Sequence, residues 1–136
     1  MMKRVGSLVL LTTVALVLMA MGGKGAGFER SPRVEKNFSV LVVDVSGNKI
    51  EGEKFSWEGR IHLDGSLGMA QVVIPFDKVK ELTVGEKRDR KVRVTVHLKD
   101  GSETMVDVDA DARCYGDAVF GSFMLTMAEI KSVTFK

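Results

Sequence analysis

The sequence predicts an all-β protein made of two tandem five-stranded antiparallel units behind an N-terminal signal helix. From residue 38 onward, Val, Ile, Thr and Phe recur at every second position between glycines and aspartates. This period-two pattern is typical of strands with one buried face, and helical spacing never persists for three turns. In addition, residues 74–84 and 125–135 repeat one pattern at an offset of 51 residues. Together these observations predict a duplicated β unit.

Residues 1–22 have the parts of a signal peptide. Lys3 and Arg4 precede an uncharged run over residues 5–21, and small residues follow at Ala20 and Gly22. This order predicts export to the periplasm or beyond, with cleavage after Gly22. The alternative is an uncleaved helix that anchors the protein in the inner membrane, although the run is short for a span of about 20 residues. The glycine-rich residues 23–37 then predict a flexible linker.

The first unit is predicted over residues 38–84 and the second over residues 91–135. The second opens with a hairpin over residues 92–109, and a three-residue loop at 100–102 would pair Val96 with Val106 and Arg93 with Asp109. Each unit ends with a strand, a short polar corner and a closing strand. The halves are expected to form either two small barrels or one fused β-sandwich.

Five short strands with a tight corner before the last resemble the SH3-like and Sm-like small barrels. Residues 94–101 look like the first Sm motif, and residues 123–133 look like the second. The resemblance implies a fold only, because the Asp and Asn residues with which that family binds RNA have no counterpart here. An Sm-like nucleic-acid binder is the alternative if the chain is not exported.

The charge of the exported part argues against two classes of partner. Without Lys3 and Arg4, the 20 basic residues of the chain fall to 18, which equals the number of acidic residues. Nucleic-acid binding requires a surplus of Lys and Arg, and so does binding to anionic lipid. We therefore expect that the protein binds no nucleic acid, and that it binds no membrane once the signal peptide is removed.

Few residues are candidates for chemistry. Asp107, Asp109 and Asp111 are spaced like the start of a Ca²⁺ loop, but Ala112 and Ala118 replace the glycine and glutamate that such a loop needs. They are therefore only weak metal candidates.

The sequence predicts no catalytic residue and no cofactor. His62 and His97 have no metal-ligand spacing, and Cys114 has no catalytic motif around it.

Two groups of residues are candidates for a binding surface. Arg88 and Arg90 belong to the one charge cluster, residues 86–91, where an acidic partner could dock. Trp57 and Tyr115 are aromatics in loop-rich regions. The sequence thus favours a non-enzymatic envelope module that binds another envelope protein or a peptide. The alternative is a small periplasmic enzyme or ligand-binding protein with a site between the two halves.

Overall fold

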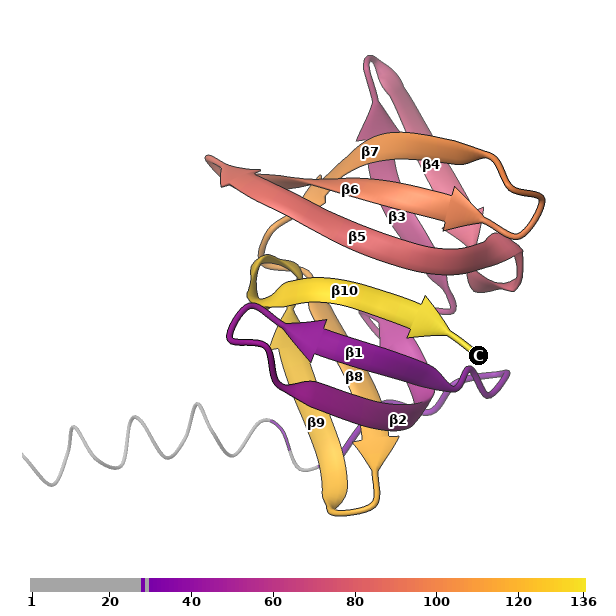
Figure 1. The fold of residues 1–136 in the computed structure, drawn as a ribbon, viewed down its shortest axis with the longest axis vertical. Helices are drawn as coiled ribbons and strands as arrows, with labels where there is room; N and C mark the ends of the chain where they lie inside the picture. Colours follow the sequence, from indigo (N-terminus) through magenta and orange to yellow (C-terminus); the bar gives the residue numbers. More distant parts are fainter. Residues whose placement is uncertain (1–27, 29) are drawn as a thin grey trace, which may run out of the picture.

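A computed structural model describes Phe28 and residues 30–136, and it shows an all-β protein. Ten strands form one antiparallel sheet that curls on itself (Figure 1). The elements in chain order are β1 (Val40–Asp44), β2 (Lys49–Trp57), β3 (His62–Leu67), β4 (Ala70–Pro75), η1 (Phe76–Lys78), β5 (Val79–Arg88), β6 (Lys91–Leu98), β7 (Glu103–Asp109), β8 (Arg113–Ala118), β9 (Gly121–Thr126), η2 (Met127–Glu129) and β10 (Ile130–Phe135).

The expected signal helix, the predicted cleavage site and the first part of the linker lie outside the described residues. Within the described part of the chain, no helix has the length and hydropathy needed to cross a membrane.

The two halves share one sheet and exchange hairpins. The strand order is β4-β3-β7-β6-β5-β10-β1-β2-β8-β9. Hairpin β3–β4 of the first half therefore pairs with β7 of the second, and hairpin β8–β9 of the second half pairs with β2 of the first. Neither half forms a sheet of its own, so the expectation of two separate five-stranded barrels is wrong. The fused alternative takes the form of one curled sheet, because all ten strands belong to one hydrogen-bonded order.

The strand order has an internal two-fold symmetry. Exchanging β1–β5 with β6–β10 reproduces the same order read backwards. The registers obey the same exchange: Val42 pairs with Val133 where Val96 pairs with Leu82. Residues of β1 and β2 thus correspond to residues 54 positions later, and residues of β3–β5 to residues 51 positions later. The pairing of Glu53 with Asp117 and of Asp107 with Ser66 fits both offsets.

The corners before β5 and β10 are equivalent 3₁₀ turns. Phe76 and Met127 begin them, and both side chains are buried. In the second corner, Glu129 accepts hydrogen bonds from the Thr126 backbone N–H (2.9 Å) and hydroxyl (3.0 Å). The bond from the N–H is one half of a capping box, in which the third residue of the turn binds the backbone of the residue before the turn.

The hairpin register differs from the prediction by two residues. Arg93 pairs with Asp107, and Val94 pairs with Val106. The loop spans residues 99–102, because the Leu98 N–H donates to the Ser102 carbonyl (2.8 Å) and Gly101 takes a left-handed conformation (φ 92°). A shift by two residues leaves every side chain on its predicted face.

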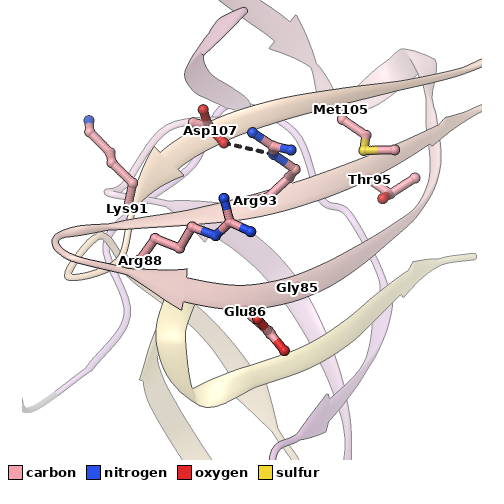
Figure 2. A pocket seen from close by; sticks show the side chains of 8 residues that line it. All are labelled: Gly85, Glu86, Arg88, Lys91, Arg93, Thr95, Met105 and Asp107. Atoms are coloured by element: carbon pink, nitrogen blue, oxygen red, sulfur yellow. Dashed lines mark hydrogen bonds and ion pairs between the residues drawn. The ribbon is translucent and has the colours of Figure 1, made fainter.

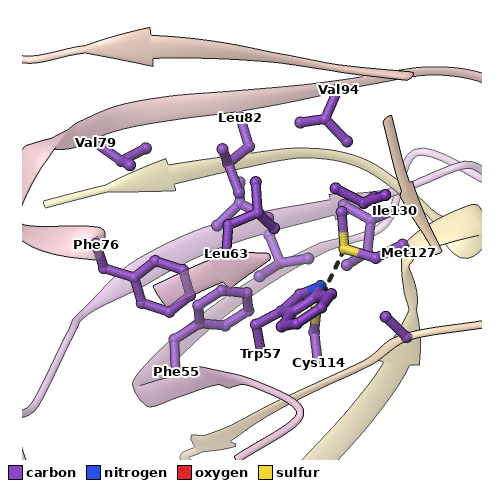
Figure 3. Close-up of a cluster of buried hydrophobic side chains, with 14 of the residues drawn as sticks. Phe55, Trp57, Leu63, Phe76, Val79, Leu82, Val94, Cys114, Met127 and Ile130 are labelled. Atoms are coloured by element: carbon purple, nitrogen blue, oxygen red, sulfur yellow. Dashed lines mark hydrogen bonds between the residues drawn. The ribbon is translucent and has the colours of Figure 1, made fainter. Parts of the chain in front are cut away.

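The core lies on the inner side of the curled sheet. Valines from the central strands meet a cluster of aromatic rings at one end, and Figure 3 shows part of this packing. The rings of Phe38, Phe55, Phe76 and Phe135 have centroids 5.0–6.1 Å apart. Such pairs add about 0.5–1.5 kcal/mol each to the free energy of burial.

Candidate functional site

Three basic side chains and two carboxylates help to line a hollow on the outer face of β5, β6 and β7 (Figure 2). We call it the basic hollow; its volume is about 300 Å³. Its lining residues are Gly85, Glu86, Arg88, Lys91, Arg93, Thr95, Met105 and Asp107.

Two of the three cations in the basic hollow have no ion pair within the described part of the chain. Arg93 Nε lies 3.2 Å from Asp107 Oδ1, which is opposite it across β6 and β7. Arg88 and Lys91, at the end of the β5–β6 hairpin, make no such contact. Exposed cations without partners attract acidic groups at little desolvation cost.

A second hollow adjoins the first and runs over the outer face of β3, β4 and β7. We call it the hairpin groove; its volume is about 350 Å³. Its lining residues are Trp57, Asp64, Gly65, Ser66, Gln71, Val72, Val73, Lys91, Asp107, Val108 and Asp109. Three carboxylates therefore face one lysine, so the groove is acidic overall.

The carboxylates of the hairpin groove differ in their partners. Asp64 contacts Arg60 (3.0 Å) and His62 (2.6 Å). Asp109 has no ion pair among the described residues, and its Oδ1 accepts the Asp111 N–H (2.9 Å). Asp109 is thus the carboxylate best placed to meet a basic group from outside.

The equivalent groove of the other half is covered by the chain itself. The segment made of Phe28 and residues 30–37 is here called the N-terminal segment, and its first residues lie on the outer face of β8 and β9. Ser31 donates its hydroxyl to the Gly116 carbonyl (2.7 Å) and its N–H to the Ser122 hydroxyl (3.1 Å). The Phe28 ring lies 5.6 Å from the Tyr115 ring.

The covered surface and the hairpin groove correspond residue by residue. With the offset of 51 residues, Tyr115, Gly116 and Ser122 correspond to Asp64, Gly65 and Gln71, which all line the hairpin groove. No described segment of the chain crosses the hairpin groove. The residues that correspond to the N-terminal segment form the end of β5 and the turn after it, so they are not available to cover the groove.

Trp57 and Tyr115 do not share a surface. Trp57 pairs with Cys114, whereas Tyr115 pairs with Ser56, so the two rings lie on opposite faces of the sheet. Only 6% of Trp57 is exposed, and its Nε1 has no hydrogen-bond partner among the described residues. Tyr115 instead supports the N-terminal segment.

The fold separates the residues of the charge cluster, residues 86–91. Arg88 faces the basic hollow, and Arg90 lies in the turn, where its carbonyl accepts the Ala110 N–H (2.8 Å). Lys91 and Arg93 contribute to the hollow, and sequence reasoning did not single them out. Their alternation with the valines of β6 is the sequence pattern that could have identified them, because it places both side chains on the outer face beside Arg88.

Asp107, Asp109 and Asp111 do not gather around one point. Asp107 binds Arg93, and Asp109 accepts the Asp111 N–H in the turn after β7. The part of the chain that the structure describes has no group of three His, Cys, Asp or Glu side chains that could hold a metal ion.

The remaining candidates for chemistry lie apart from one another. His62 contacts Asp64, while His97 Nδ1 lies 3.0 Å from Glu103. Cys114 is buried and its thiol lies 3.4 Å from the Met127 sulfur. Burial first, and the Glu58 charge second, raise the pKa of the Cys114 thiol well above its ordinary value. A thiol held in its protonated form is a poor nucleophile.

The comparisons with known proteins identify the family. A family model described as "Uncharacterised protein" matches residues 34–136. The chain belongs to this family. It is also similar to an "Uncharacterized protein" of Aquifex aeolicus (strain VF5), with 24% identity over 106 residues, 78% of this chain and 80% of that protein. No solved structure matches.

Proposed function

We propose that this protein is an exported, non-enzymatic binding module that holds an extended segment of a partner protein in the hairpin groove. The observation that carries the proposal is the N-terminal segment. The surface equivalent to the groove already holds a piece of chain without regular secondary structure, through backbone and hydroxyl hydrogen bonds at Ser31. A surface that serves this purpose in one half offers the same opportunity in the other.

The lining of the groove indicates what kind of segment would fit. Asp64 replaces Tyr115 at the position where the Phe28 ring packs, so an aromatic side chain would meet a carboxylate there. Asp109 adds a charge without an ion pair among the described residues. A segment with Lys or Arg side chains is therefore preferred, because complementary charge guides association and fixes the register of the bound chain.

The neighbourhood of the groove supports a contact with protein. Val73 is 62% exposed on the edge strand β4, and Leu67 and Met69 are exposed at the hairpin tip. Figure 1 shows that hairpin β3–β4 projects from one end of the molecule. Apolar side chains on a projecting edge are typical of protein contacts, and an edge strand has free backbone groups.

Photo-crosslinking in the native envelope tests this function. A benzophenone amino acid replaces Val73 at the groove and, as a matched control, Val45, which is 65% exposed in the β1–β2 turn. We expect the Val73 position to give one crosslinked partner, with the crosslink in a single basic segment of that partner. A synthetic peptide with the sequence of that segment should block the crosslink. Equal labelling at both positions, or a peptide that does not compete, would contradict the proposal.

Export is tested separately on the protein recovered from cells that express the full sequence. We expect mass spectrometry to find a mature N-terminus at Gly23, as the small residues Ala20 and Gly22 predict. A protein that retains residues 1–22 and fractionates with the inner membrane would instead support the anchored form.

A further inference from the structure

A hollow in the other half of the molecule carries the opposite charge. It has a volume of about 450 Å³ and lies against β2 and the end of β8, beside Ser39 and Lys136, and we call it the acidic hollow. Its lining residues are Ser39, Glu51, Gly52, Glu53, Asp117, Ala118, Val119 and Lys136. Three carboxylates face one lysine there, whereas three cations face two carboxylates in the basic hollow.

The internal symmetry relates half of the lining of the two hollows. The offsets of the fold place Ser39 at the position of Arg93, Glu51 at that of Met105, Glu53 at that of Asp107, and Lys136 at that of Gly85. Arg93 of the basic hollow is thus replaced by a neutral residue in the acidic hollow, and Met105 by a carboxylate.

The key charges of both hollows are free to act outside the molecule. Arg88 and Lys91 have no ion pair among the described residues, and neither does Glu53. Glu51 contacts Lys136 (3.3 Å), and Asp117 accepts the Ser122 hydroxyl (2.8 Å). The unpaired cations and the unpaired carboxylate therefore lie in two separate hollows of the same chain.

We propose that the basic hollow binds the acidic hollow of a second copy of this chain. The charge complementarity of the two hollows carries this inference, which goes beyond the proposed function and uses a surface that adjoins the hairpin groove and shares Lys91 and Asp107 with it. In a dimer with a two-fold axis, the contact of Arg88 and Lys91 with Glu53 forms twice, because each copy supplies both hollows. The interface consists of exposed charges, so it weakens as salt screens them.

Sedimentation velocity of the purified protein tests the proposal. We expect a dimer at 50 mM NaCl that dissociates by 500 mM NaCl. Arg88→Glu and Glu53→Lys should each weaken association by about tenfold, since each places like charges in both contacts. Lys99→Glu, in the β6–β7 loop, makes the same change of charge away from both hollows and should leave the dimer intact.

Mixing the two variants gives the sharpest result. An equal mixture of Arg88→Glu and Glu53→Lys should recover a heterodimer, because one contact is then native and the other has its charges exchanged. A protein that stays monomeric at 50 mM salt, or a mixture that does not recover association, would overturn the proposal. Neither substitution touches the hairpin groove, so crosslinking at Val73 would persist if only this inference failed.

Discussion

The ring of Phe123 lies against Gly116 so closely that a Cβ on this glycine would be 2.4 Å from the ring's Cζ. The same edge of the ring also reaches Gly52, where a Cβ would lie 2.7 Å from Cε2. Both positions therefore require glycine, because any side chain there would collide with the ring of Phe123. The ring, 7% exposed, closes the inner side of hairpin β8–β9.

We expect Gly116→Ala to lower the free energy of unfolding by about 1–3 kcal/mol, the usual cost of overpacking a core. Urea unfolding followed by tryptophan fluorescence measures this. Phe123→Leu should reduce the penalty of the alanine in a double-mutant cycle, because the clashing ring atoms are gone. Equal penalties in both backgrounds would show that the ring does not set the requirement at position 116.

Cys114 should make stability fall at high pH. Its folded-state pKa is raised above the ordinary value of 9.0, so the thiol stays protonated in the folded protein while it ionises in the unfolded chain. The stabilisation is complete below pH 9 and decreases above it, by at most about 1.4 kcal/mol per pH unit. Urea unfolding between pH 8 and 10.5 should show this slope in the protein but not in Cys114→Ala.

The same burial predicts chemical behaviour. A thiol reagent at pH 8 should label Cys114 only after unfolding, because the native thiol is neither exposed nor ionised. Rapid labelling of the folded protein would show that the region around Met127 opens readily.

The Asp100 carboxylate should contribute to acid sensitivity. Hydrogen bonds from the Ser102 hydroxyl, and then from its backbone N–H, lower the pKa of Asp100 below its ordinary value of 3.8. Stability from this group is present above pH 3.8 and is lost as the pH falls through the lowered pKa. The melting temperature of Asp100→Asn should therefore depend less on pH between 2 and 5 than that of the unmodified protein.

The N-terminal segment should be released by changes beneath it. Tyr115→Ala removes the ring under Phe28, and Ser31→Ala removes the hydroxyl that binds the Gly116 carbonyl. We expect trypsin to cut after Arg33 several times faster in the double variant, because a bound segment must detach before a protease can hold it. Unchanged cleavage would show that these contacts do not retain the segment.

The sequence predicted the local structure better than the assembly. Period-two patterns placed the strands, and the offset of 51 residues located both corners. The pairing of β3 with β7 could not be read from the sequence, because hairpin β3–β4 has an apolar face that fits either its own half or the other. Strands that follow one another in the sequence usually lie side by side. In this fold, hairpin β3–β4 instead pairs with β7 of the other half.

The candidate site was predicted only in part. Arg88 was singled out from a run of charges, but the hollow also needs Lys91 and Arg93, which the run or the strand pattern presents as ordinary surface residues. Trp57 and Tyr115 were grouped by residue type, and the register of β2 with β8 separates them. The hairpin groove is a candidate because the corresponding surface of the other half holds the N-terminal segment, and this relationship appears only in the three-dimensional structure.

The exchange of hairpins has a consequence for the architecture as a whole. A chain of half this length could build the same sheet only by lending its hairpin to a second molecule and receiving one in return. Joining the halves at the tight turn after Arg88 turns that encounter between molecules into one within a single chain, so the sheet no longer depends on concentration. The two halves are then free to diverge, and one protein can carry hollows of opposite charge.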